Sequence, residues 1–324
     1  MKPAVLAALL TLGGMAGSGQ AAPAAAPAAG RLGDIAWAFP VPPPPTGAPR
    51  STARVIGLSG STAVFSDAEI HDLFHAVDWR PKSHPAAPAI VLAGRPPDAM
   101  ACGFCHLPGG QGRPENANIA GLPAAYIRQQ LADMRSGARE GVQPAYRATA
   151  LMHQVARGLT PAEAAQAADY FSRLPFTSRL RVIEAASIPH AEAAAGLYRF
   201  TPGPPTPLGH RIIEGPDSFE RFELRDDRVG FFAYVPPGAI SRGAALAAGD
   251  EHRPACASCH GKSLHGDVGP PLAGRSPSGL FRQLAAFSVG ARAGPASGPM
   301  RDIAGKLSTD EMIDLAAYAG SLKP

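Results

Sequence analysis

The stretch Cys102-Gly103-Phe104-Cys105-His106 returns later as Cys256-Ala257-Ser258-Cys259-His260, and these two stretches decide the fold. The 324-residue chain has four cysteines, and both copies of the C-x-x-C-H pattern together use all of them. In this pattern the two thiols can add to the vinyl groups of one haem, and the next histidine ligates the iron. The sequence therefore predicts two covalent haem c groups. The predicted attachment and axial residues are Cys102, Cys105, Cys256, Cys259, His106 and His260.

Two other uses of paired cysteines are possible. Exported thiols often form disulfides, and two C-x-x-C pairs can supply the four thiolates of a zinc site. Neither use requires a histidine directly after the second cysteine of both pairs. The repeated histidine therefore favours haem attachment over both alternatives.

The residues that follow the two motifs also repeat. Residues 119–121 and 127–131 match residues 272–274 and 280–284, each 153 positions later, and Arg139 matches Arg292 at the same offset. Residues 152–159 then match residues 300–307 at an offset of 148. The chain is therefore a duplicated unit with a haem motif, a middle helix and a closing segment in the same order.

Each closing segment leads into a predicted helix. Thr160 and Ser308 stand three residues before Glu163 and Glu311, which is the pattern of a capping box at a helix N-terminus. A methionine lies shortly before each of these helices. Its thioether is soft and neutral and can be the sixth ligand of haem iron.

Met152 and Met300 are the matched methionines, and we expect each to lie in a loop before its helix and to ligate iron. A methionine can instead fill core space, and that interpretation suits Met134 and Met312, which lie within helical patterns. His153 is the local rival of Met152, because imidazole also binds haem iron.

The two units resemble class I cytochrome c domains, and their pairing resembles the diheme cytochrome c4 type. The match rests on the two C-x-x-C-H motifs, the glycine-rich residues 109–112, residues 119–121 and 269–274, and the Met152 and Met300 segments. It covers about residues 96–176 and 241–324, roughly half of the chain. The resemblance implies an all-α fold of two class I domains, each around one haem with an exposed edge, with irregular or short-strand extensions.

The resemblance also implies that a backbone carbonyl holds the axial histidine ring. For His260 the candidates are Pro270 and Pro271, whereas the first unit has Ala117-Asn118 at that place.

The remaining segments define the organisation of the chain. Residues 1–22 read as a signal peptide, with Lys2 before a short apolar run at residues 5–12 that cannot span a bilayer. We expect an Ala/Pro-rich arm at 23–50, an N-terminal extension at 51–95, cytochrome c domain 1 at 96–176, an inter-domain connector at 177–240 and cytochrome c domain 2 at 241–324. The expected location is the periplasm, with no membrane span.

The extension and connector carry short patterns of their own. We expect strands at 55–58, 181–183, 211–213 and 231–235, a helix at 66–76, and an opening helix of the second domain at 241–248. His71 and His75 are four residues apart on the predicted helix and could bind a metal, although a packed or solvated helix face is the commoner outcome. His265 is expected to make a local loop contact. The segment before Cys102 is rich in proline, so we expect the usual contact between the first and last helices to be distorted in the first domain.

The predicted function is single-electron transfer in the periplasm by two His/Met-ligated haems. Expected partners are a quinol–cytochrome c reductase, a dehydrogenase or a terminal oxidase. The net charge of +4 is spread over scattered cations and gives no support to nucleic-acid binding.

An electron carrier is favoured over an enzyme. The alternatives are a diheme cytochrome c peroxidase, which needs an iron with an open sixth site, and an electron-transfer subunit of a periplasmic dehydrogenase complex.

Overall fold

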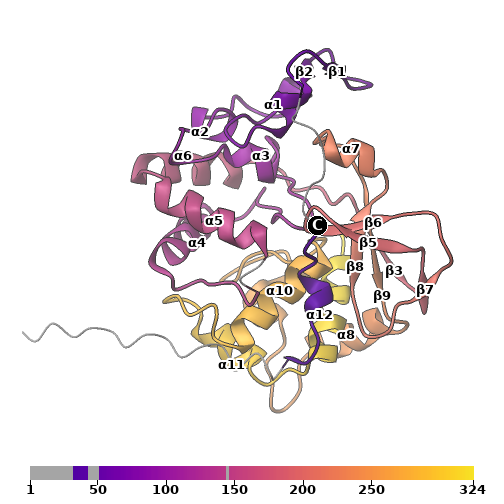
Figure 1. Ribbon diagram of the computed structural model, residues 1–324. Coiled ribbons are helices and arrows are strands. Elements are labelled where there is room, and N and C mark those ends of the chain that lie inside the picture. The colour runs from indigo at the N-terminus through magenta and orange to yellow at the C-terminus, as the bar shows by residue number, and fades with distance from the viewer. Residues whose placement is uncertain (1–31, 43–50, 144–145) are drawn as a thin grey trace, which may run out of the picture.

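The computed structural model describes residues 32–42, 51–143 and 146–324 (Figure 1). The predicted signal peptide and most of the Ala/Pro-rich arm lie outside these residues. Two groups of helices follow the two C-x-x-C-H motifs, and a smaller β region lies between them in the sequence. The fold is thus largely helical, with strands in the connecting segments.

The first helix group begins with the single-turn α2 and contains the first motif in α3. Its elements are α2 (Ala89–Leu92), α3 (Cys102–His106), α4 (Ala124–Ser136), α5 (Arg147–Gly158) and α6 (Pro161–Ser172). The capping box predicted for α6 is present: the Thr160 hydroxyl accepts from the Glu163 amide, and the Glu163 carboxylate accepts from the Thr160 amide. This reciprocal pair satisfies amides that the first helical turn would otherwise leave without partners.

The second helix group repeats this plan with a longer opening helix. Its elements are α8 (Ala239–Ala247), α9 (Ala257–His260), the 3-10 turn η4 (Lys262–Leu264), α10 (Pro277–Ser288), α11 (Gly298–Ala304) and α12 (Thr309–Ser321). Ser308 and Glu311 form the second predicted capping box. The opening helix predicted at 241–248 is confirmed with a start two residues earlier.

Gly243 permits the close crossing of α8 and α12. A Cβ atom at this position would lie 2.0 Å from the carbonyl oxygen of Asp314 and 2.8 Å from Cβ of Tyr318. On the solvent side, the Arg242 guanidinium bonds both carboxylate oxygens of Asp314, each at 2.8 Å. Main-chain proximity and a bidentate ion pair therefore fix this helix pair together.

The N-terminal extension contains the hairpin of β1 (Val55–Gly57) and β2 (Val64–Ser66), then α1 (Asp67–His71) and the 3-10 turn η3 (Pro81–Ser83). The helix predicted at 66–76 is too long, because α1 ends at His71. Asp72 has extended backbone angles, and its carboxylate accepts from the amide of Phe74 at 2.9 Å. This local bond competes with helix continuation, so His75 does not share the helix face of His71.

The strands of the connector are paired with one another instead of standing alone. Its elements are β3 (Leu180–Glu184), β4 (Ser187–Ile188), β5 (Ala191–Ala194), β6 (Leu197–Phe200), β7 (Thr206–Pro207), β8 (Ile213–Pro216), α7 (Phe219–Glu223) and β9 (Phe231–Val235). Central β9 pairs parallel with β3 and antiparallel with β8, and β4–β7 and β5–β6 form two further pairs. The strand expected at 211–213 begins only at its last residue. The strands expected at 181–183 and 231–235 are present as β3 and β9.

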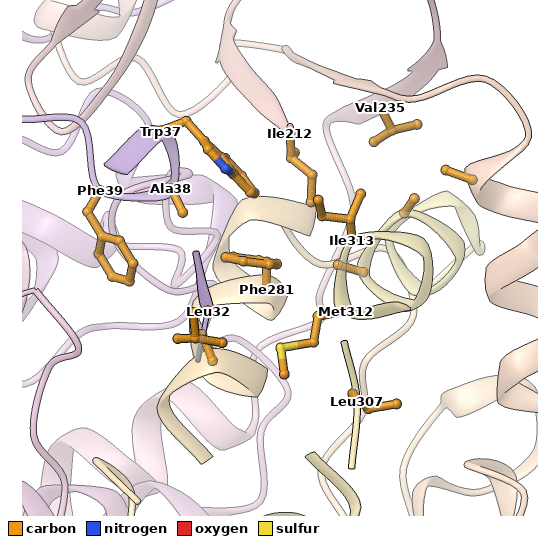
Figure 2. Packing of buried hydrophobic residues seen from close by; sticks show 14 of the residues in the cluster. Leu32, Trp37, Ala38, Phe39, Ile212, Val235, Phe281, Leu307, Met312 and Ile313 are labelled. Carbon is orange, nitrogen blue, oxygen red and sulfur yellow. The ribbon is translucent and has the colours of Figure 1, made fainter. Parts of the chain in front are cut away.

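The largest core cluster joins the arm to the second helix group. Figure 2 shows Trp37 beside Phe281, with Met312 and Ile313 on the neighbouring helix. The rings of Trp37 and Phe281 have centroids 4.6 Å apart. Met312 is fully buried in this cluster, which confirms its interpretation as a core residue. The described part of the arm, with the 3-10 turn η2 (Ala36–Ala38), is thus packed rather than a free tether.

Within the described residues, no helix combines the length and apolar character that a membrane crossing requires.

Replacing Gly243 with alanine should destabilise the protein by about 1–3 kcal/mol, because the added methyl group must force α8 away from α12. Chemical unfolding of the haem-loaded protein measures the change. Ser241→Ala, at an exposed position of the same helix, is the matched control and should change stability by less than about 0.5 kcal/mol. Equal effects of the two substitutions would contradict the close-crossing explanation.

Candidate haem site

Both C-x-x-C-H motifs form short helical turns. All four cysteines of the chain are described, and all four are free thiols. Burial raises the pKa of the Cys102 thiol to about 12, and burial also raises the pKa of Cys105. Among the described residues, no cluster of three or more His, Cys, Asp or Glu side chains could hold a metal ion, so the two pairs do not meet in a zinc site.

The axial histidines have matching anchors. His106 Nδ1 lies 2.8 Å from the carbonyl oxygen of Ala117, and His260 Nδ1 lies 2.8 Å from that of Pro270. Because a carbonyl only accepts, Nδ1 must carry the proton in both rings, and Nε2 keeps a lone pair for a metal. Burial lowers the pKa of both imidazoles, which favours this neutral form. Of the two prolines suggested by the resemblance, Pro270 is the one that accepts.

The Ala117 anchor shows that the first motif keeps the same geometry without the Gly-Pro-Pro loop. Gly112 has a positive φ of 63°, and a Cβ atom there would lie 2.5 Å from the Ala117 carbonyl oxygen. The tight turn at Gly112 therefore brings the Ala117 carbonyl beneath the His106 ring. The donor set of both motifs, two thiols and one Nδ1-protonated imidazole, fits covalent haem c.

Met152 and Met300 lie in helices, not in the loops expected from the sequence. Met152 is in the middle of α5, half-buried against the core cluster of the first helix group. Met300 is in the first turn of the short α11, where Pro299 stands at an initial position that suits a helix start. Apolar Leu151, Met152 and Val155 follow helical spacing, which accounts for the extended α5.

Three other histidines lie against main-chain carbonyl oxygens. His153 Nε2 lies 2.8 Å from the carbonyl oxygen of Arg139, so that nitrogen donates to the backbone. His265 Nε2 lies 2.9 Å from the carbonyl oxygen of Lys323, a contact with the C-terminal segment instead of the local loop contact expected from the sequence. His71 Nδ1 lies 2.8 Å from the Asp67 carbonyl oxygen in the turn of α1. These contacts fit structural roles for the three residues.

A polar network between the two helix groups has the symmetry of the repeat. Arg139 bonds the side-chain oxygens of Gln130 and Gln283 at 2.8 and 3.0 Å, and Arg292 bonds the same two oxygens at 2.7 and 3.0 Å. The main chains pair beside them, with Glu140 N–Ala291 O at 2.6 Å and Ala293 N–Ala138 O at 2.7 Å. Burial, followed by repulsion from Arg292, lowers the pKa of Arg139 to about 9. The repeated Gln and Arg positions were visible in the sequence, but their meeting across an interface was not.

The connector covers the first motif and leaves the second motif open. The Arg225 guanidinium lies over the Phe104 ring, 3.4 Å from its centroid, and donates to the Phe104 carbonyl oxygen at 2.9 Å. Gly103 and Phe104 are buried, whereas Ala257 and Ser258 at the equivalent positions are exposed. Sequence reasoning missed this cover, since nothing near Arg225 in the sequence points to Cys102–His106.

Gly269→Ala should weaken axial ligation at the second motif. The new Cβ atom would lie 2.8 Å from both Cε1 and Nδ1 of His260, so the ring must move away from the Pro270 carbonyl. Loss of such an anchor typically costs about 10–100-fold in affinity. Titration of the loaded protein with free imidazole, followed optically, should show easier ligand displacement. Gly109→Ala is the control, because its nearest atom is the flexible Gln111 Cγ at 3.8 Å; a similar change there would contradict the anchor.

Comparison with known proteins gives a consistent family. Residues 240–323 match the cytochrome c domain family. The thiosulfate dehydrogenase electron acceptor of Thiomonas intermedia (strain K12) is 29% identical over 238 residues, which cover 72% of this chain and 83% of that protein. The protein of the same name from Stutzerimonas stutzeri (strain A1501) is 30% identical over 230 residues, which cover 69% of this chain and 80% of that protein.

A solved thiosulfate dehydrogenase from Marichromatium purpuratum is 27% identical, with a TM-score of 0.48; the match covers 71% of this chain and 38% of that longer one. Cytochrome c4 of Azotobacter vinelandii is 35% identical over 105 residues, which cover 29% of this chain and 50% of that protein. Taken together, these sequence matches show that the chain belongs to the c4-like cytochromes c, the family that includes the electron acceptors of thiosulfate dehydrogenase.

Proposed function

We propose that this chain is an exported electron carrier with two covalent haems, one at each C-x-x-C-H motif. The observation that carries the proposal is the matched pair of anchored histidines, each with Nδ1 on a carbonyl and Nε2 available for iron. Cys102, Cys105, Cys256 and Cys259 would attach the haems. When bound, each haem supplies a one-electron Fe(III)/Fe(II) couple.

Met152 and Met300 are the proposed sixth ligands. Their matched positions in the two repeats, each shortly before the capped closing helix, support this assignment. His153 is disfavoured as the rival ligand, because its Nε2 is engaged with the Arg139 carbonyl. A thioether on each iron would raise the reduction potential and leave no open site for substrate.

The Arg139–Arg292 interface supports transfer between the two sites. Two main-chain hydrogen bonds and two Arg–Gln hydrogen bonds, Arg139–Gln283 and Arg292–Gln130, connect the helix groups at this place. Such a contact resists rotation of one group against the other. It would hold the two haems at a constant separation, so that an electron accepted at one site can pass to the other without a docking step.

Location and partners are further parts of the proposal. The N-terminal pattern of residues 1–22 supports export to the periplasm, where covalent haem attachment and the expected redox partners occur together. Two relatives are named as electron acceptors of thiosulfate dehydrogenase. A thiosulfate-oxidising enzyme is therefore the first donor to test, ahead of a quinol–cytochrome c reductase; a terminal oxidase is a candidate acceptor.

The first experiment is an optical titration of the purified protein. We expect two haems per chain and a weak band near about 695 nm in the oxidised form, typical of methionine-ligated ferric haem. Peroxide should not reoxidise the reduced protein rapidly. A high-spin component with rapid peroxide-driven oxidation would instead indicate an open iron and the peroxidase alternative.

The second experiment tests the donor. Oxidised protein mixed with a catalytic amount of thiosulfate dehydrogenase should become reduced when thiosulfate is added. Without the enzyme, thiosulfate should leave the spectrum unchanged. Reduction by thiosulfate alone would mean that this chain is itself an enzyme, and no reduction in either mixture would exclude this donor.

A further inference from the structure

The two haem motifs are equivalent in sequence but not in surroundings. In the second motif Ala257, Ser258 and Cys259 are exposed, and the Ser258 hydroxyl donates only to the nearby Ala255 carbonyl at 2.6 Å. In the first motif the matching Gly103 and Phe104 are buried, and Cys105 is half-buried. The duplicated units therefore differ at the side of the haem where the thioether bonds form.

Ala76 and Val91 of the N-terminal extension cover Gly103, and Phe104 is covered by Arg225. Arg225 is 9% exposed and reaches the first motif from the connector, just after α7. Its Nε donates to the Ile70 carbonyl oxygen at 2.7 Å and its Nη1 to the Phe104 carbonyl oxygen at 2.9 Å. Its φ of 57° is in the left-handed region, which a non-glycine residue enters only when its surroundings hold it there. The side chain is thus fixed over Phe104 by three contacts.

The positive charge of Arg225 is not cancelled by a carboxylate. Among the described residues it forms no ion pair, and its partners are two neutral carbonyls and an aromatic ring. The neighbouring cation behaves differently: Arg113 pairs with the buried Glu115 at 2.9 Å. Glu223, at the end of α7, is another nearby carboxyl and is more exposed, where solvent screens it. The adjacent Asp226 is buried and is paired with Arg80 and Arg221. A net positive charge therefore remains at the first motif.

A fixed, poorly solvated cation destabilises the more positive member of a nearby redox pair. Ferric haem carries one more positive charge than ferrous haem, and exclusion of water acts in the same direction. Near the second motif, the Arg253 guanidinium is paired with carboxylates, with Asp250 at 3.1 Å and with Glu311 at 3.5 Å, so its charge is offset. We propose that Arg225 raises the reduction potential of the first haem above that of the second haem. This inference rests on the proposed two-haem function.

The electron therefore comes to rest at the first haem, while the exposed motif of the second haem exchanges electrons with partners. The asymmetry gives electron transfer within the chain a direction, with exchange at the exposed second motif and storage at the covered first motif.

Redox titration of Arg225→Gln tests the inference. Met300→His serves as the reference background, because exchange of methionine for histidine lowers the potential of the second haem and so identifies its wave. In this background Arg225→Gln should lower the reduction equilibrium constant of the first haem about tenfold, which is about 59 mV for one electron. Arg225→Lys, which keeps the charge, should shift the wave less.

Arg228→Gln, an exposed arginine in the same segment, is the matched control and should leave both waves in place. A first-haem wave that does not move in Arg225→Gln, or that moves equally in Arg228→Gln, would overturn the inference. If Arg225→Gln fails to fold, the order of potentials decides in its place. With Arg225 intact, Met152→His must lower the higher of the two waves, and a fall in the lower wave would overturn the inference.

Failure of the proposed function would look different. A chain with one haem, or with an iron that reacts with peroxide, would refute the two-haem carrier before any substitution is compared. Two haems whose reduction potentials do not change in Arg225→Gln would refute only the role of Arg225.

Discussion

The hydrogen bond between an imidazole Nδ1–H and a main-chain carbonyl is the constraint on which this structure depends. A C-x-x-C-H turn places a histidine next to two thiols, but the free ring could rotate and could carry its proton on either nitrogen. At His106 and His260 a carbonyl oxygen 2.8 Å away removes both freedoms. The loops that deliver these carbonyls differ, with Gly-Pro-Pro at one site and a glycine-based turn at the other. The chain thus preserves the bond while changing the sequence that makes it.

Around this constraint the duplicated plan is kept where the two helix groups meet and abandoned where they face other parts of the chain. The interface uses Gln130 and Arg139 against their repeats Gln283 and Arg292. Elsewhere the symmetry ends: α8 crosses α12 at full length, whereas single-turn α2 replaces the corresponding helix in the first group. The space left there is filled by the N-terminal extension and by the connector. Inserted segments therefore make two equivalent units chemically unequal.

The sequence predicted what depends on local chemistry. Capping boxes at Thr160 and Ser308, the strand at residues 231–235 and the core role of Met312 follow from patterns within a few residues, and the structure confirms them. The end of α1 was missed because one carboxylate, Asp72, diverts the backbone. The sheet of the connector was missed because its strands pair across 51 positions, as in Leu180 with Phe231, and the cover over Phe104 was missed because Arg225 lies 121 positions away. The iron ligands remain predictions, supported by position and donor chemistry.

The docking of the arm has a consequence for how the protein reaches its final state. Leu32 and Ala38 are held through their carbonyl oxygens by Thr309 at 2.9 Å and Arg282 at 3.0 Å, and Trp37 packs on Phe281. The arm also contacts the middle of the chain, because the Tyr198 hydroxyl donates to the Trp37 carbonyl oxygen at 3.0 Å and Phe39 packs against Tyr146. Its docking therefore needs residues from three separate parts of the sequence. This core can close only after α10 and α12, the helices that follow the second haem motif, have taken their places.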